Sequence, residues 1–221
     1  MPRVTVHYAQ SLDGRIATCI GESQWIGGPA SLQLAHQLRA EHPAVLVGVG
    51  TVLADNPRLT VRLVPGRSPS RVVLDSRLRL PTSSNVVVDG AAPTLVATTP
   101  AAPRERIAAL RDLGAEVLVV DADDAGQVDL RYLLNTLDER GLASVLIEGG
   151  GGVITSALRA RLVDRLVVCI AARVIGAGVA AIGDLGVRRL TEAPGFASAR
   201  FTPLGGDVIF EGELERTNGV G

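Results

Sequence analysis

Short apolar runs alternate with amphipathic stretches along most of this chain, a pattern typical of strands and helices in an α/β sheet. Several runs are apolar throughout, as expected for strands covered on both faces. Such runs predict strands at Val4–Ala9, Ala44–Val49, Arg71–Leu74, Val86–Val88, Thr94–Thr98, Val117–Val120, Ser144–Ile147 and Leu166–Ala171. Apolar residues at helical spacing predict helices at Pro29–Glu41, Pro103–Leu113, Leu130–Arg140 and Val153–Ala160.

The pattern changes near the C-terminus. Two runs, Phe196–Pro203 and Asp207–Leu214, flank the turn-like Leu204–Gly206, which predicts an antiparallel hairpin. We therefore expect an α/β fold with a mixed, mainly parallel sheet flanked by helices and antiparallel strands at one edge. Nothing resembles a linker between domains, so we expect residues 1–221 to form a single domain that frays after Arg216.

Composition narrows the classes of function. The chain has 221 residues, is 47% hydrophobic and carries a formal net charge of −1, which gives no overall field for nucleic acid or an acidic membrane. All 22 basic residues are arginine, so an anion must be held by Arg or by backbone N–H groups. Cys19 and Cys169 lack disulfide or zinc spacing, and no apolar run reaches about 18 residues. We expect a cytoplasmic protein with reduced thiols and no membrane span.

Two polar segments near the N-terminus depart from the core pattern. In Ala9–Ala17 a strand runs into a tight turn at Asp13-Gly14, a pair that by itself indicates only a turn. In Gly21–Ile26 a loop before the first predicted helix holds Trp25, the only tryptophan of the chain. This side chain either plugs the core or forms a wall for a flat heteroaromatic ligand, and the segment alone leaves both readings open.

Two further segments join a buried strand to a glycine-rich turn. In Val47–Arg62 the strand ends in Gly-x-Gly-Thr, without the third glycine of a dinucleotide fingerprint. In Leu146–Ser156 four successive glycines precede a helix, a construction that seats a phosphate on free N–H groups at the positive end of the helix dipole. We expect a valine at Gly151 to prevent anion binding there while the chain still folds.

These segments, in this order, resemble the reductase domain of riboflavin biosynthesis, a family with a dihydrofolate-reductase-like fold. The matching motifs are Ser-Leu-Asp-Gly-Arg-Ile-Ala at 11–17, Gly-Glu-Ser-Gln-Trp-Ile at 21–26, Gly-x-Gly-Thr-Val-Leu-Ala-Asp-Asn-Pro-x-Leu-Thr-Val-Arg at 48–62, Val-Leu-Asp-Ser at 73–76 and Glu-Gly-Gly-Gly at 148–151. The resemblance covers residues 3–214. It implies a homodimeric oxidoreductase that uses NADPH to reduce a 5-amino-6-(5-phosphoribosylamino)pyrimidine, in its uracil or 2,5-diamino-pyrimidinone form, to the ribitylamino product.

The resemblance also implies the residues that contact each ligand. Those facing the phosphorylated substrate would be Ser23, Arg39, Leu59, Arg62 and Glu148. Those lining the dinucleotide site would be Ala9, Trp25, Thr51, Asp55, Ser76, Gly150, Gly151, Gly152, Val153, Ile154, Thr155 and Ser156. Arg39 and Arg62 would hold the 5′-phosphate, a role suited to a planar guanidinium. Asp55 and Glu148 are the catalytic candidates, because carboxylates can orient substrate hydroxyls and ring nitrogens.

The sequence departs from the family pattern at His7, where bacterial bifunctional enzymes usually carry Lys. His7 either assists protonation near the ring or simply packs in its strand. The stretch Tyr8–Asp13 resembles stand-alone fungal and archaeal reductases, whereas Gly21–Ile26 resembles bacterial ones, so the aminated and the deaminated substrate both stay open. The same fold could also serve a pterin, folate or secondary-metabolite substrate, or a non-catalytic nucleotide-binding module, although the arginines favour a phosphorylated substrate.

The cofactor preference depends on a short segment after the predicted Arg71–Leu74 strand. Ser76, Arg77 and Arg79 offer a hydroxyl and two cations for an adenosine 2′-phosphate, which favours NADPH over NADH. Asp75 opposes this reading, because carboxylates at such strand ends often select NADH.

Overall fold

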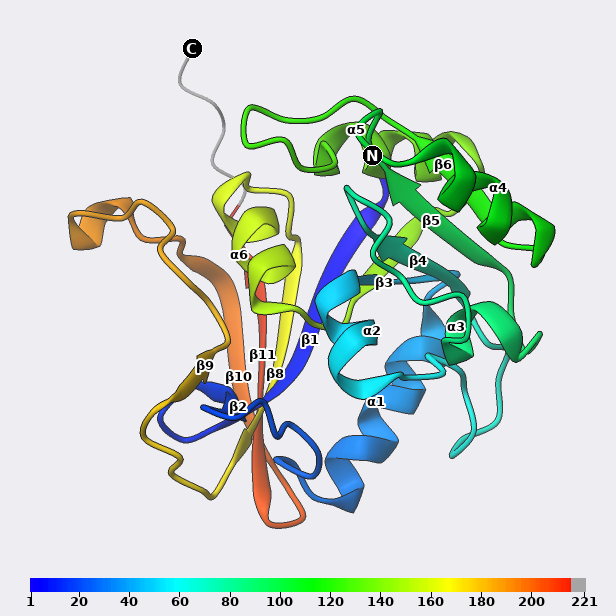
Figure 1. Ribbon diagram of the computed structural model, residues 1–221. Helices are drawn as coiled ribbons and strands as arrows, with labels where there is room; N and C mark the ends of the chain where they lie inside the picture. The colour runs from blue at the N-terminus through cyan, green and yellow to red at the C-terminus, as the bar shows by residue number, and fades with distance from the viewer. Residues whose placement is uncertain (216–221) are drawn as a thin grey trace.

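The computed structural model describes residues 1–215, so the fraying expected after Arg216 lies outside the described residues. Within that range a nine-stranded sheet runs through the molecule in the order β10-β11-β8-β1-β7-β3-β4-β5-β6 (Figure 1). Its strands are β1 (Arg3–Ser11), β3 (Ala44–Gly48), β4 (Ser70–Leu74), β5 (Thr94–Thr98), β6 (Glu116–Val119), β7 (Ser144–Ile147), β8 (Arg165–Ala171), β10 (Phe196–Leu204) and β11 (Asp207–Leu214). From β8 to β6 all neighbours are parallel, and the β10–β11 hairpin joins β8 antiparallel. The predicted mixed sheet with an antiparallel edge is confirmed.

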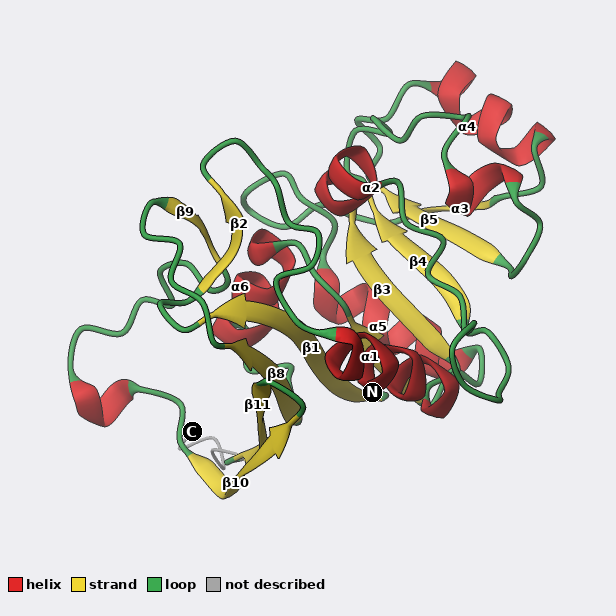
Figure 2. Cartoon of the chain, turned by 90° about the horizontal axis from the view of Figure 1, so that it is seen from below, coloured by secondary structure: helices red, strands yellow, loops and turns green. Residues whose placement is uncertain are grey.

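Helices cover both faces of this sheet (Figure 2). One face packs against α5 (Leu130–Glu139) and α6 (Gly151–Arg159). The other packs against α1 (Pro29–Glu41), α2 (Val49–Asp55), α3 (Asn85–Val88) and α4 (Arg104–Asp112). The four leucines of α5 recur at helical spacing and are all buried, which gives that helix one apolar stripe and explains why the sequence pattern found it. No helix within residues 1–215 has the length and apolar character needed to cross a membrane.

Side-chain alternation along β1 gives this central strand two different faces. Val4, Val6 and Tyr8 belong to the core beneath α5 and α6. His7 and Ala9 therefore point to the opposite face, where Ala9 packs against the core on the α1 side. The same alternation that builds the core thus directs two residues of β1 toward the region between the sheet and α1.

The predicted strand at Val86–Val88 is wrong, because these residues form the short helix α3. Its first turn is closed by backbone hydrogen bonds from Val87 and Val88 to the carbonyl of Ser84. Val86 and Val87 are buried, while Val88 is exposed. Three consecutive apolar residues are too few for periodicity to distinguish a strand from one helical turn.

Several short elements were not predicted from the sequence. They are α2, where a strand to Val49 and a turn had been expected, β2 (Arg15–Thr18), β9 (Gly178–Ala180) and the 3-10 turn η1 (Leu190–Glu192). β2 and β9 pair antiparallel as a small second sheet. The carboxylate of Asp13 anchors the loop before β9 by accepting hydrogen bonds from the backbone N–H groups of Ile175 and Gly176. A hydrogen bond from the Ser11 hydroxyl, together with these two backbone bonds, holds the pKa of Asp13 below its ordinary value.

Candidate active site

Two cavities lie at the carboxyl ends of the central parallel strands. The first cavity has a volume of about 640 Å³ and includes residues of β1, the loop before α1, α2 and the segment after β7. The second cavity, of about 660 Å³, lies between the loop after β4, the segment before α5 and the start of α6. Gly50 and Gly150 line both cavities, so the two spaces adjoin at these glycines. Ligands in parallel α/β sheets characteristically bind at this end of the strands.

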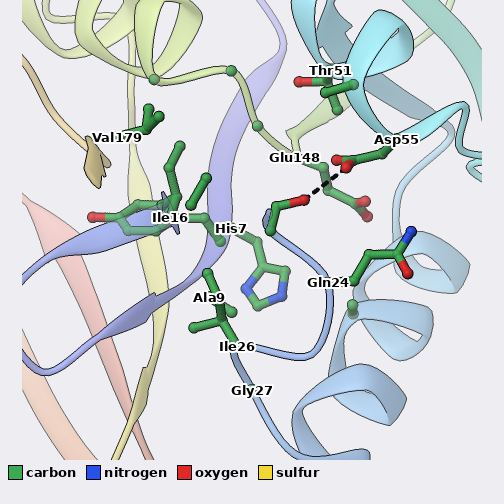
Figure 3. A pocket seen from close by; sticks show the side chains of 18 of the residues that line it. His7, Ala9, Ile16, Gln24, Ile26, Gly27, Thr51, Asp55, Glu148 and Val179 are labelled. Carbon is green, nitrogen blue, oxygen red and sulfur yellow. Dashed lines mark hydrogen bonds between the residues drawn. The ribbon is translucent and has the colours of Figure 1, made fainter. Parts of the chain in front are cut away.

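The first cavity has a polar wall made of residues from three elements (Figure 3). The Ser23 hydroxyl donates a hydrogen bond of 2.6 Å to Oδ1 of Asp55, which ties the loop before α1 to the end of α2. Thr51 lies one helical turn before Asp55 on the same face. Glu148 follows β7 directly, and its backbone N–H still bonds to Leu46 of β3. The sequence-predicted residues Ser23, Thr51, Asp55 and Glu148 therefore gather in one place.

The rest of the first cavity is largely apolar. Ala9 lies on its β1 side, and Trp25 borders it with a side chain that is 69% exposed. Trp25 therefore does not plug the core, and it has a backbone φ of 65°, which is uncommon for a bulky residue and is often found at functional sites. Ile16 and Val179 line the same cavity from β2 and β9, which no sequence pattern had singled out.

The two predicted phosphate-binding arginines meet at Thr60. Arg39 donates to the Thr60 carbonyl at 3.2 Å, and Arg62 donates to the Thr60 hydroxyl at 2.6 Å. Arg39 is mainly engaged elsewhere, because Nε and Nη2 bind the two carboxylate oxygens of Glu148 at 2.7 and 2.5 Å. Three of the five N–H groups of its guanidinium are thus used within the chain. Arg62 has an exposed side chain and remains open to an outside ligand.

The structure places Leu59 differently from the expected substrate contact. Its side chain is 2% exposed, packs in the core on the α2 side and lines neither cavity. Arg58, which the sequence motif treated as a variable position, is exposed near Arg62. Partial burial, together with the positive charges of Arg39 and Arg58, lowers the pKa of Arg62. The guanidinium groups of Arg58 and Arg62 therefore lie near that of Arg39, which is paired with Glu148.

The second cavity carries two arginines that have no ion-pair partner among residues 1–215. Arg77 and Arg79 are exposed on the loop after β4. The Ser76 hydroxyl donates to Oε1 of Gln127 at 3.2 Å and accepts from the N–H of Val128 at 3.0 Å, which joins this loop to the segment before α5. Two arginine side chains without acidic partners at a cavity wall form a suitable binding site for an anion.

Asp75 is held within the same loop. Its side chain is buried, at 1% exposed, and Oδ2 accepts a hydrogen bond of 2.7 Å from the N–H of Leu80. The carboxylate therefore stabilises the turn that displays Arg77 and Arg79. Asp75 also lines the second cavity, and among the described residues its Oδ1 has no hydrogen-bond partner, so the objection that the sequence raised stands.

The glycine loop between β7 and α6 separates the two cavities. Gly149 and Gly150 have φ values of 126° and 80°, which side-chain-bearing residues rarely adopt. A Cβ on Gly151 would lie 2.8 Å from the carbonyl oxygen of Ala180, so the expectation for valine at Gly151 is wrong: that side chain would disturb the packing of α6 against β9. Gly152 borders the second cavity and has open space where a Cβ would lie.

Only part of the predicted cofactor loop faces a cavity. Gly150, Gly152, Val153 and Ser156 line the second cavity, and Gly151 lines the first. Ile154 is fully buried in the core. The Thr155 hydroxyl donates to the Gly151 carbonyl at 2.5 Å and accepts from the N–H of Gly183. Ile154 and Thr155 thus point away from both cavities, as helical periodicity requires for a helix that packs on a sheet.

Comparison with known proteins gives one family. A family model described as the RibD C-terminal domain matches residues 2–210. The chain is 39% identical over 209 residues to the "Riboflavin biosynthesis protein RibD" of Aquifex aeolicus, covering 94% of this chain and 56% of that protein. It is 40% identical over 215 residues to the "2,5-diamino-6-ribosylamino-4(3H)-pyrimidinone 5′-phosphate reductase" of Methanothermobacter thermautotrophicus, covering 95% and 97%. The chain thus spans just over half of the RibD relative and nearly all of the archaeal one.

Solved structures give the same result. Acinetobacter baumannii RibD superposes with a TM-score of 0.82 at 30% identity, covering 98% of this chain and 59% of that one. Dihydrofolate reductase from Enterococcus faecalis superposes with a TM-score of 0.54 at 13% identity, covering 97% of both chains. The second likeness concerns the fold alone, and it confirms the expected dihydrofolate-reductase-like architecture.

Proposed function

This chain belongs to the RibD C-terminal domain family, and we propose that it catalyses the NADPH-dependent reduction of a 5-amino-6-(5-phosphoribosylamino)pyrimidine to the ribitylamino product in riboflavin biosynthesis. The observation that carries this proposal is the junction of the two cavities at Gly50 and Gly150. A dinucleotide extended along the second cavity can bring its reactive end into the first, where Asp55 and Glu148 lie. Binding both reactants in adjoining spaces supplies most of what a hydride transfer needs from a protein.

The second cavity fits the adenosine and phosphate part of NADPH. Arg77 and Arg79 supply unpaired cations for a 2′-phosphate, and Ser76 lies beside them. The open space at Gly152, at the N-terminal end of α6, suits the pyrophosphate. Ala9, Trp25 and Thr51 would then border the nicotinamide in the first cavity. When bound, NADPH supplies the hydride that reduces C1′ of the ribosylamino group.

Residues of the first cavity, together with arginines that lie outside its lining, would bind and orient the substrate. Arg62, with Arg58 nearby, supplies the positive charge for the 5′-phosphate. Arg39 holds the Glu148 carboxylate in one orientation, and Ser23 does the same for Asp55. These two carboxylates would accept hydrogen bonds from substrate hydroxyl and N–H groups. No observation favours a pterin or folate substrate, whereas the arginine cluster favours a phosphorylated one.

The decisive experiment measures NADPH oxidation with the aminated and the deaminated pyrimidine phosphates side by side. Turnover of one or both, with NADPH preferred over NADH, supports the proposal and identifies the form reduced. Binding of NADPH without turnover of either pyrimidine would refute the proposed reaction while leaving the cofactor assignment intact. Equal catalytic efficiency with NADH would instead refute the role given to Arg77 and Arg79.

We also propose that the protein works in the cytoplasm as a homodimer. Both cysteines are free thiols, which suits a reducing compartment. β10 is the edge strand of the sheet, and most of its side chains are exposed. The segment around η1, drawn in orange in Figure 1, extends away from the body of the molecule and carries Leu190 at 94% exposed. An open edge and an exposed apolar side chain on an extended arm suit contact with a second copy.

A further inference from the structure

His7 is a buried histidine in the first cavity, on β1. In Figure 3 its ring lies among Ala9, Ile26 and Glu148. Nδ1 lies 3.0 Å from the carbonyl oxygen of Val167 on the neighbouring strand β8. A carbonyl can only accept a hydrogen bond, so Nδ1 must carry the hydrogen. In a neutral ring the second nitrogen, Nε2, is then an acceptor.

The surroundings keep this ring neutral. Burial lowers the pKa of His7, the charges of Arg39 and Arg165 lower it further, and Glu148 and the bond to Val167 oppose the shift without reversing it. Among residues 1–215 no protein group is hydrogen-bonded to Nε2 of His7. The ring therefore presents one unpartnered acceptor at the wall of this cavity, where Ala9 and Ile26 are apolar neighbours.

We propose that Nε2 of His7 accepts a hydrogen bond from an N–H group of the substrate's aminopyrimidine ring and thereby fixes the orientation of that ring. The inference rests on the proposed function, which supplies the heterocycle. The amino substituents and the protonated ring nitrogens of an aminopyrimidine are N–H donors, and an unpartnered acceptor at a cavity wall selects for a donor. In the neutral ring the only N–H is directed at β8, so Nε2 is placed to accept a hydrogen bond rather than to donate one.

Two substitutions separate the nitrogen atoms of the ring. His7→Asn places an amide N–H near Nδ1, so it can keep the bond to Val167, but it has no acceptor at the position of Nε2. His7→Gln reaches the position of Nε2 with a carboxamide oxygen and gives up the bond to Val167. We expect His7→Asn to raise KM for the pyrimidine roughly 10- to 100-fold, with unchanged NADPH affinity and melting temperature. We expect His7→Gln to recover most of the substrate affinity.

Each contrary result has its own meaning. Absence of turnover by the wild type would overturn the proposed function and this inference with it. If the wild type is active and His7→Asn keeps the wild-type KM, only the role of His7 is overturned. Equal losses in the Asn and Gln variants would show that ring shape matters rather than the acceptor. Weaker NADPH binding by His7→Asn would place the contact on the cofactor and also overturn the inference.

A measurement on the wild type guards against poor folding of the Asn variant. In protein labelled with ¹⁵N histidine, the His7 resonances are assigned by their loss in His7→Gln. Addition of the pyrimidine phosphate should move the Nε2 resonance from that of a free unprotonated nitrogen toward that of a hydrogen-bonded one, while Nδ1 stays protonated. An unchanged Nε2 resonance at saturating substrate would overturn the inference.

Discussion

Arg39 and Glu148 form a buried, two-bond ion pair, with Nε 2.7 Å from Oε1 and Nη2 2.5 Å from Oε2. Their side chains are 12% and 6% exposed. Arg39 comes from the last turn of α1 and Glu148 from the residue after β7, so the pair ties the helix to the centre of the sheet. Arg39 therefore determines the orientation of the Glu148 carboxylate in the first cavity. This role does not depend on contact with a phosphate.

Arg39→Ala should be strongly destabilising, because it leaves the Glu148 carboxylate buried without its partner. Breaking such a pair costs about 3–5 kcal/mol. Urea unfolding measures the effect, and Arg62→Ala is the matched control, since the exposed Arg62 should cost less than about 1 kcal/mol. A loss below about 1 kcal/mol for Arg39→Ala would contradict the structural role assigned to the pair.

Arg62→Ala should weaken binding of the phosphorylated substrate by roughly 1.5–3 kcal/mol, or about 10- to 150-fold, because a charge-assisted contact to the phosphate is lost. NADPH affinity should be unchanged, since Arg62 lines neither cavity wall assigned to the cofactor. The dephosphorylated substrate should bind the wild type weakly and be indifferent to the substitution, a comparison that isolates the pairwise contact. Equal weakening of both compounds would rule out the phosphate contact.

Gly152→Val should abolish NADPH binding without unfolding the chain. A side chain at Gly152 meets no protein atom within 4 Å, so it would project into the space assigned to the pyrophosphate. Gly206→Ala is the control, because that glycine, in the β10–β11 turn, also has open space and lines neither cavity. Titration with NADPH measures binding, and an unchanged melting temperature shows that the variant is folded. Wild-type affinity in Gly152→Val would show that the loop has only a structural role.

Leu190→Glu should convert the proposed homodimer into a monomer, because it places a charge on the exposed apolar tip of the arm at η1. Thr191→Glu adds the same charge beside it, at a residue that is already polar, and serves as the control. Sedimentation velocity at several concentrations distinguishes the two states. A wild type that is monomeric at all concentrations would exclude the dimer itself. A dimer that survives Leu190→Glu would instead place the interface elsewhere.

The sequence predicted most of the sheet because its strands are apolar on both faces, as Thr94–Thr98 and Ser144–Ile147 show with boundaries that match the structure. It failed at Val86–Val88, where one helical turn and a short strand bury similar residues. The motifs brought Ser23, Thr51, Asp55 and Glu148 to one cavity, but they did not reveal that Leu59, Ile154 and Thr155 face the core, or which polar atoms were already engaged. That depends on pairing across the fold, which a local pattern does not contain.

Arg39 and Gly151 illustrate this limit. Arg39 fits a phosphate by residue type, yet its guanidinium is largely satisfied by Glu148, a residue 109 positions away. Gly151 fits an anion-binding loop, yet a glycine is needed there because the carbonyl of Ala180 leaves no room for a side chain. In both cases the partner lies far along the chain, so only the folded arrangement distinguishes a ligand contact from an internal one.

The last prediction concerns pH. His7, His36 and His42 are buried, and burial is the main cause that lowers the pKa of each, to about 4 for His36 from an ordinary value of 6.5. Well above pH 6.5 these residues are neutral in both the folded and the unfolded chain, so they add no pH dependence there. As the pH falls from 6.5 toward 4, the unfolded chain binds protons that the folded chain does not, and the free energy of unfolding must decrease. For His36, a pKa lowered from 6.5 to about 4 corresponds to a decrease of about 2–3 kcal/mol by pH 4.5.

Urea unfolding between about pH 7.5 and pH 4.5 measures this loss. His36→Asn should reduce the slope, because Asn can still accept the hydrogen bond that Arg62 donates from its backbone to Nδ1 at 2.9 Å but binds no proton in this range. Aspartates with lowered pKa values, such as Asp13 and Asp207, lose their contribution only at lower pH, since their pKa values lie below 3.8. A free energy of unfolding that stays constant or rises on acidification to pH 4.5 would show that the buried histidines take up protons in the folded chain.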